Sequence, residues 1–263
     1  MSFITWRNLL PTALTALLML GISSVVAAQT GNTHAAQTLA QGSAAERAAA
    51  LARIRATPVE VRGPEVLPAL LEELHRQSAR LEARAAALRE GRAVEPSEGE
   101  GESLLDVLDL VTQHEQDPRI IPALLPFIAT GNRVIDVLAA FGERSVSQVA
   151  DIAASHTRSD ADVHSALLTL QRMLQKPTRT PLSADSRQLI IKVAQMRLTG
   201  TQALSVALAA VDLAAATRDP ALIHRLEIVS QDAGEVRALG LTEDLVPRLQ
   251  TRAATALRSS AHD

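Results

Sequence analysis

A cluster of metal-ligating residue types lies between two histidines, His156 and His164. The segment reads HTRSDADVH and also holds the carboxylates of Asp160 and Asp162. Imidazole nitrogen and carboxylate oxygen both ligate divalent cations, so one hypothesis is a metal-binding protein or a metal-dependent enzyme. A structural hypothesis explains the same residues, because Ser159 or Asp160 suits the N-cap of a helix and acids stabilise its first turn. We favour the second hypothesis and predict no bound metal.

Two aspartates that directly precede proline, Asp117 and Asp219, are further candidates for chemistry. Aspartate is a common N-cap, and proline fits the first turn of a helix because its missing N–H would have no partner there. Each Asp-Pro pair is therefore expected to begin a helix. The chain contains none of the motifs H-E-x-x-H, G-x-S-x-G, S-x-x-K or G-x-x-x-x-G-K, and it has no cysteine. We predict a protein that is not an enzyme and uses no cofactor.

Basic side chains fall on a set of helices that each follow another helix closely, which we term second helices. If these helices line one face, their cations can bind carboxylate or phosphate groups of a protein or peptide partner. The alternative is that they form a solvated stripe opposite the core. The residues are Arg119, Arg144, Arg187, Lys192, Arg197 and Arg225.

The composition excludes several classes of binding protein. Of the 263 residues, 47% are apolar, but there is no Tyr, one Trp and three Phe. Stacking on sugars or nucleobases requires exposed aromatic rings, and a net charge of −3 provides no general attraction to nucleic acid. Phe127 and Phe141 are expected to fill the core between helices. We therefore predict no nucleic-acid partner.

The first 28 residues are predicted to be a secretory signal. A short basic segment ending at Arg7 precedes an uncharged, mostly apolar run, which ends in the small residues of VVAAQ before a cleavage point near Ala27 or Ala28. The protein is then periplasmic or secreted, and its abundance of alanine and arginine suits a bacterial source. The alternative is an uncleaved anchor, because about 20 apolar residues can span a bilayer. Only in that case do we expect contact with a membrane.

The next segments are predicted from their polarity and capping residues. Residues 29–42 are small and polar, and we expect them to be disordered. Residues 43–90 are expected to form a helical hairpin, with Ser43 and Glu46 as a capping box for its first helix. Residues 91–103 contain four glutamates and three glycines, which predicts a flexible acidic linker and a domain boundary.

The longer helix of this hairpin, over residues 65–90, carries leucines at a spacing of seven. They are Leu67, Leu74, Leu81 and Leu88. A sustained seven-residue spacing indicates a seam between helices. One hypothesis is self-association through this seam. The other, which we favour, is that the seam packs within the chain, on the preceding helix or on the next domain.

Residues 104–263 are predicted to be a domain of short amphipathic helices. Apolar residues recur at the helical spacing of Val134, Leu138 and Phe141, and no segment alternates as a strand would. We expect helices over 104–113, 133–141, 161–174, 183–198, 201–216 and 242–257. The second helices begin near residues 117, 144, 185 and 219, which is an average repeat of about 34 residues.

The segment DPRIIPALLPFIATGNRVIDVLAAFGERSVSQVADIA, residues 117–153, resembles the helix–Gly turn–helix units of HEAT-repeat and armadillo-like α-solenoids. The starts DPRIIPALLPFI and DPALIHRLEIVS also align with each other. The resemblance implies an all-α solenoid of short antiparallel helix pairs whose second helices line a concave binding face. We therefore expect an exported, non-enzymatic scaffold that binds a protein or peptide.

Overall fold

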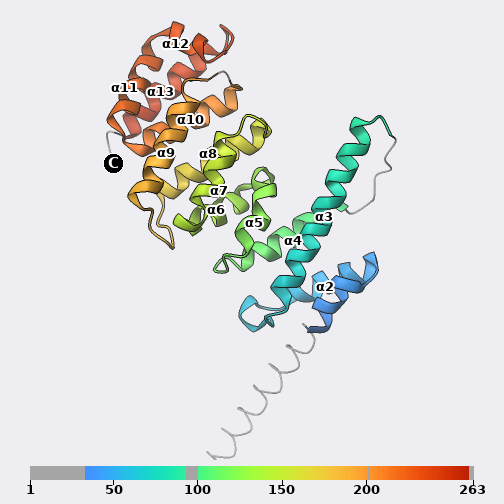
Figure 1. Ribbon diagram of the computed structural model, residues 1–263. Coiled ribbons are helices and arrows are strands. Elements are labelled where there is room, and N and C mark those ends of the chain that lie inside the picture. The colour runs from blue at the N-terminus through green and yellow to red at the C-terminus, as the bar shows by residue number, and fades with distance from the viewer. Residues whose placement is uncertain (1–32, 93–99, 201, 261–263) are drawn as a thin grey trace, which may run out of the picture. The chain divides into compact units, whose positions relative to one another are not determined.

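The computed structural model describes residues 33–92, 100–200 and 202–260, and within them the chain forms helices and loops without a β-strand (Figure 1). The prediction of an all-α protein is confirmed. The predicted signal, residues 1–28, and most of the predicted linker lie outside the described residues. Among the described helices, none combines the length and the apolar character that crossing a membrane requires.

The chain divides into two compact units, residues 1–114 and 115–263. The prediction placed the boundary at residues 91–103. Helix α4 (Glu100–Gln113) instead belongs to the first unit, because its apolar side packs against α3 (Val66–Arg89) and α2 (Ala44–Ala56). The acidic residues that suggested a linker therefore run into the first turn of α4.

The first unit also contains η2 (Val59–Val61) and a helix over residues 33–41. Helix α2 begins as predicted, since the Ser43 hydroxyl accepts from the Glu46 amide at 3.4 Å and the Glu46 carboxylate accepts from the Ser43 amide at 2.7 Å. These bonds satisfy amides that a helix start otherwise leaves unpaired. The backbone hydrogen bond from Ser43 also holds the pKa of Glu46 below its usual range.

Two expectations for the first unit differ from the structure. Residues 33–41 are helical rather than disordered, and Leu39 is fully buried. Helix α3, which carries the leucine seam, packs more against α4 than against α2, its expected hairpin partner. That seam is covered at Leu67 and Leu74 but uncovered further along, where Leu81 is 41% and Leu88 is 58% exposed.

The second unit consists of short helices, most of which the sequence predicts to within a few residues. Their bounds are α5 (Ile120–Leu124), η3 (Leu125–Thr130), α6 (Asn132–Phe141), α7 (Glu143–Ala154), α8 (Asp160–Gln175), α9 (Ala184–Arg197), α10 (Leu204–Thr217), α11 (Pro220–Gln231), α12 (Ala233–Ala238) and α13 (Val246–Ser260). Helix α12 was not predicted, because six residues are too few to show a periodic pattern.

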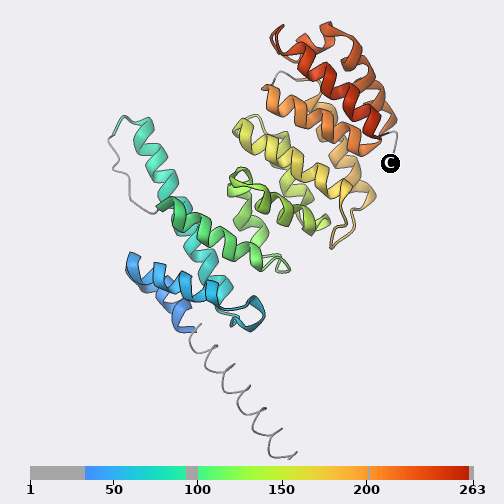
Figure 2. The same cartoon turned by 180° about the vertical axis from the view of Figure 1, so that it is seen from behind.

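Helices of the second unit pack against helices that lie two or three places away in the chain. Helix α8 contacts α6 and α10, and α10 contacts α13. We call these four helices the first row, and three of them, α8, α10 and α13, lie side by side in Figure 2. Helices α7, α9 and α11 form the second row, since α9 contacts both of the others. Contacts such as α7 with α8 and α9 with α10 hold the two rows together.

Polar bonds between neighbouring helices of a row join residues about 40 positions apart. In the first row, Lys176 donates to Asp136 at 3.0 Å, a separation of 40 residues. Arg252 donates to Asp212 through Nε at 2.6 Å and Nη2 at 2.5 Å, again 40 residues apart. In the second row, Arg197 donates to the Ala153 carbonyl at 2.7 Å, 44 residues away. The repeat in space is therefore longer than the predicted 34 residues.

The error in the repeat length comes from treating the two Asp-Pro segments as equivalent. Asp219 caps α11, accepting from two amides at 3.1 Å, as expected. After Asp117, however, α5 is only five residues long. A 3-10 helix follows it, and the helical backbone is interrupted at Phe127 (φ −110°, ψ 17°). Pro126 has no N–H for an α-helical bond, which accounts for the change. This segment is not a counterpart of α11.

The turn between α6 and α7 is fixed by a glycine. Gly142 has φ +56°, and a Cβ placed there would lie 2.2 Å from the Thr180 carbonyl oxygen. That oxygen accepts from the Glu143 amide at 3.2 Å, so the proline-containing loop before α9 lies directly on this turn. Phe141 is buried as predicted, and the Arg179 guanidinium lies 5.4 Å from its ring centroid. Only glycine combines this φ with this close approach.

Replacing Gly142 with alanine is expected to reduce the free energy of unfolding by about 2 kcal/mol or more, because it adds left-handed strain and a clash with Thr180. Urea denaturation of the purified protein measures this change. Gly200→Ala is the matched control, since its Cβ would meet nothing closer than the Met196 carbonyl at 3.8 Å. Equal stability of the two variants would contradict the packing of the loop on this turn.

Candidate functional site

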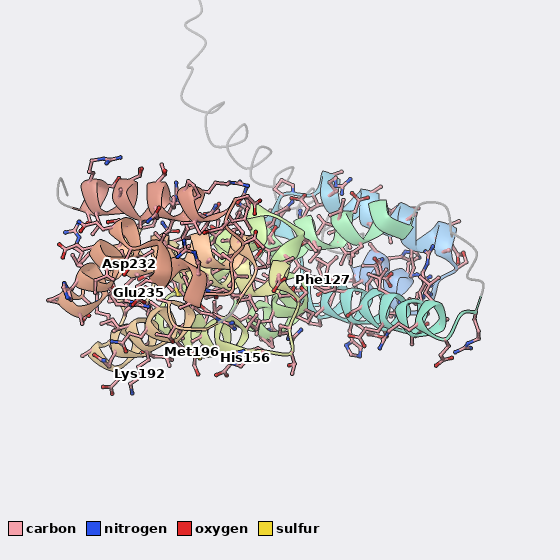
Figure 3. All side chains as sticks on the ribbon, turned by 90° about the horizontal axis from the view of Figure 1, so that it is seen from above. Phe127, His156, Lys192, Met196, Asp232 and Glu235 are labelled. Carbon is pink, nitrogen blue, oxygen red and sulfur yellow. The ribbon has the colours of Figure 1, made fainter. Side chains whose placement is uncertain are left out.

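The predicted binding cations separate into different environments. Arg144 on α7 and Lys192 on α9 are exposed, and neither forms an ion pair with any residue that the structure describes. Exposed acids lie seven residues away on the same helix sides, Asp151 on α7 and Asp185 on α9. The outer face of the second row is therefore mixed in charge, rather than basic as one hypothesis had it. Lys192 is labelled at the margin of the second unit in Figure 3.

Two other predicted cations are already paired within the chain. Arg119 precedes α5, outside both rows, and its Nη2 lies 2.6 Å from Asp117 Oδ2. The hydrogen bond to Asp117 raises the pKa of Arg119. Arg225 on α11 is half-buried and lies 2.7 Å from Glu235 of α12. Both arginines stabilise local structure through these ion pairs. A partner would have to displace the two carboxylates before it could bind either guanidinium.

Arg197 has a structural position that its sequence context did not reveal. Its side chain is buried and donates to the carbonyls of Ala153 at 2.7 Å and Ser155 at 2.6 Å, at the end of α7. Burial lowers the pKa of Arg197, and the nearby Asp160 opposes that shift. A guanidinium that satisfies unpaired carbonyls at a helix end stabilises that end. Arg197 therefore links α9 to α7 rather than facing a partner.

Arg187, the remaining predicted cation, lines a cavity of about 730 Å³ in the second unit. The cavity lies at the C-terminal parts of α8, α10 and α13, and Arg187 reaches it from α9. Its other charged residues are Asp212, Arg218 and Arg252. Sequence reasoning missed these three, although Asp212 and Arg252 occupy positions 40 residues apart in neighbouring helices of the first row. A predicted repeat of 40 residues would have placed Asp212 and Arg252 at equivalent positions of neighbouring helices.

The four candidate metal ligands do not form a site. His156 is exposed in the loop before α8, and His164 Nδ1 lies 2.9 Å from the Ser205 carbonyl. Ser159 caps α8 by accepting from the Asp162 amide at 3.1 Å, as the structural hypothesis predicts. Throughout the described ranges, no three His, Cys, Asp or Glu residues come together in a way that could hold a metal ion. The geometry therefore does not favour the metal hypothesis.

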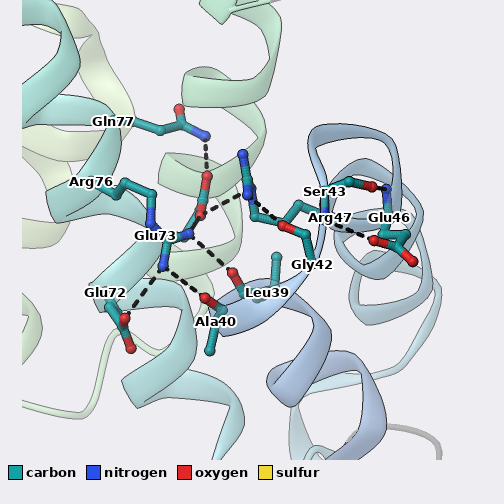
Figure 4. Close-up of polar contacts among 10 residues, drawn as sticks. All are labelled: Leu39, Ala40, Gly42, Ser43, Glu46, Arg47, Glu72, Glu73, Arg76 and Gln77. Carbon is teal, nitrogen blue, oxygen red and sulfur yellow. Dashed lines mark hydrogen bonds and ion pairs between the residues drawn. The ribbon is translucent and has the colours of Figure 1, made fainter.

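The first unit contains a buried carboxylate, Glu73 of α3, whose side chain is drawn in Figure 4. The residue is 2% exposed. Its Oε2 forms an ion pair with Arg76 and lies 3.6 Å from Arg47 Nε, while Oε1 accepts from Gln77 at 2.9 Å. A buried carboxylate requires such compensation because its desolvation is costly.

The two arginines of this cluster also bind the C-terminal end of the helix over residues 33–41. Arg76 Nη1 donates to the Leu39 carbonyl at 3.0 Å, and its Nη2 donates to the Ala40 carbonyl at 3.3 Å. Arg47 Nη1 donates to the Gly42 carbonyl at 2.6 Å. Glu73 thus orients cations that cap an otherwise unpaired helix end. The cluster is structural, and it explains why residues 33–41 are folded.

Comparison with known proteins gives no relative for this chain: no family model, no curated protein and no solved structure matches it.

Replacing Glu73 with glutamine is expected to lower the free energy of unfolding of the first unit by about 2 kcal/mol, because Arg76 and Arg47 lose their buried counter-charge. Amide hydrogen exchange over residues 33–41 should become faster. Glu72→Gln is the control, since Glu72 also pairs with Arg76, at 3.3 Å, but its side chain is 63% exposed. That variant should change stability by less than about 0.5 kcal/mol. Equal effects in both variants would show that Glu73 does not anchor the helix.

Proposed function

We propose that this protein is an exported, non-enzymatic scaffold whose second unit is a HEAT-like α-solenoid that binds a protein or peptide partner. The observation that carries the proposal is the register of about 40 residues between neighbouring helices of each row. In a solenoid each repeat contacts only its neighbours, so the same kind of contact recurs at a fixed separation along the chain. The contacts of α8 with α6 and α10 follow this rule.

The outer surface of the second row is our proposed binding face. Its cations Arg144 and Lys192 form no ion pair with a described carboxylate. Asp151 and Asp185 lie on the same helix sides, seven residues from these cations. A partner with the complementary alternation of charge would be held in register by these groups. In solenoids of the resembled family such second helices line the concave face.

The chemistry of this face indicates moderate affinity. Tight protein interfaces rely on a few buried aromatic or arginine anchors. Phe127 and Phe141 are 6% and 1% exposed, so the repeats keep both rings in the core. The contact would therefore depend on a broad polar surface, and its strength should fall with increasing salt.

Replacing Arg144 and Lys192 together with glutamate is expected to reduce recovery of the partner at least roughly tenfold, because each reversal places like charges across the interface. The measurement is quantitative co-purification of the full chain with proteins of its native envelope fraction. Arg119→Gln is the control, since Arg119 pairs with Asp117 and lies outside the second row. Undiminished recovery with the double variant would exclude this face.

A second candidate function, self-association through α3, is favoured by the uncovered end of its leucine seam. Leu81 is 41% and Leu88 is 58% exposed, whereas Leu74 on the same seam is 1% exposed. Leucines at a spacing of seven pair with the same seam of a second helix in coiled coils. A second copy of the chain could bury both exposed leucines.

The double variant Leu81→Ser, Leu88→Ser is expected to be monomeric if the seam joins two copies, since serine removes the apolar area that the contact would bury. Multi-angle light scattering of both proteins at the same concentration reports their masses. The variant Leu105→Ser is the control, because Leu105 is 57% exposed but lies on α4. An unchanged mass in the double variant would exclude association through the seam.

A further inference from the structure

We propose that residues 176–183, which connect α8 to α9, form a strap that opens locally and uncovers the ring of Phe141. In the closed state the strap lies on the end of α6, where the Arg179 amide donates to the Ala140 carbonyl at 2.8 Å. Phe141 is 1% exposed, and the Arg179 guanidinium lies over its ring. The strap therefore covers one of the two aromatic side chains in the described part of the second unit.

The strap is longer than a connection between these helices requires. Like the strap, residues 218–219 join a helix of the first row, α10, to one of the second row, α11. Gly142 alone makes the same connection between α6 and α7. Loops on a rigid scaffold are the usual places of movement and binding. The additional length of the strap is therefore available for a movement that the shorter connections cannot make.

The strap is held in place without a buried side chain of its own. None of residues 176–183 is buried, and both of its prolines, Pro177 and Pro181, are exposed. A segment with few buried apolar contacts and with exposed hydrogen bonds opens at a lower free energy than the core that it covers. Opening of the strap therefore does not require the second unit to unfold.

The carboxylate of Glu143, at the start of α7, clamps the C-terminal end of the strap. Its Oε2 accepts from the Ser183 amide at 2.9 Å, and its Oε1 accepts from the Ser183 hydroxyl at 3.0 Å. The hydroxyl oxygen of Ser183 accepts in turn from the Ser186 amide at 3.1 Å, so the clamp and the N-cap of α9 share one side chain. Hydrogen bonds to an ionised carboxylate are stronger than those between neutral groups. Glu143 is therefore the principal polar contact that an opening strap must break.

The guanidinium over Phe141 is held by a surface contact. Arg179 Nη2 lies 2.9 Å from Glu115 Oε1, and the two side chains are 33% and 41% exposed. Such exposed pairs contribute little stability. Opening gives the second unit an aromatic anchor of the kind that tight interfaces use, a consequence that rests on the proposed partner binding. The opening itself does not depend on a partner and is tested without one.

The test is the labelling rate of a single introduced thiol, which the absence of cysteine from the chain makes specific. In Phe141→Cys, Ellman's reagent should react at least about tenfold faster than in Ala139→Cys, because local opening exposes only position 141. Ala139 is also buried, at 4% exposure, but two residues turn an α-helix by about 200°, so it lies on the other side of α6. Urea below the unfolding transition should leave the rate at position 141 unchanged.

Adding Glu143→Gln to Phe141→Cys should raise the labelling rate at least about threefold, because an amide replaces one of the two charged acceptors of the clamp. Asp151→Asn is the matched control, since Asp151 is an exposed carboxylate on α7 outside the clamp, and it should leave the rate unchanged. The proposal is overturned if positions 141 and 139 label equally, or if the rate does not respond to Glu143→Gln.

Hydrogen exchange of the unaltered chain tests the strap without a substitution in the core. The Arg179 amide, which bonds to Ala140, should exchange at a rate that low urea does not change. The amide of Val211, in the middle of the buried helix α10, is the control and should exchange faster as urea is added. If Phe141→Cys does not fold, this measurement decides, and equal urea dependence of the two amides would overturn the proposal.

Discussion

The second unit depends on the burial of α10. Of its residues, Val206, Ala207, Ala209, Ala210, Val211, Leu213, Ala214 and Ala215 are buried. Small side chains let neighbouring helices approach closely, and α10 packs against α8, α9, α11 and α13. A larger residue at one of these buried positions would push the neighbouring helix away. The small aliphatic side chains of α10 suit this close packing, and the helix itself carries no aromatic residue.

The same burial decides where polar chemistry can occur. Since α10 is covered on most of its surface, it contributes polar groups only along one narrow stripe and at its C-terminal end. Asp212 lies on that stripe and fixes Arg252 of α13, and Thr217 lies at the end. The cavity therefore forms where the row of packed helices stops. The outer face of the second row is another polar region, and two of its three helices, α9 and α11, pack against α10.

Local structure in this chain could be predicted from sequence because its causes are local. The capping box of Ser43 and Glu46 and the N-caps of Ser159 and Asp219 each involve neighbouring residues, and they fix helix starts to within a residue or two. The helical spacing of apolar residues likewise gives the all-α class. These signals place α6 to α11 along the chain, but they do not say which helices meet.

The features that sequence did not reveal depend on distant residues. The helix over residues 33–41 has little intrinsic signal and is held by Arg76, thirty-seven residues from Leu39. Arg197 reads as a solvated cation, yet it is buried against carbonyls 44 and 42 residues away. Most residues of the cavity come from α8, α10 and α13, which are separated in the chain by α9, α11 and α12. A sequence pattern that covers one or two helical turns contains no information about contacts between residues so far apart in the chain.

The ion pairs between neighbouring first-row helices have a mechanical consequence. Asp136 with Lys176 and Asp212 with Arg252 join the helices at their surface, where the cations are 60% and 49% exposed. The Debye length is about 10 Å at 0.1 M salt, so dissolved ions weaken such surface pairs while leaving the apolar contacts beneath intact. We therefore expect the row of helices to bend more easily at high ionic strength, while the apolar contacts of α10 keep the unit folded.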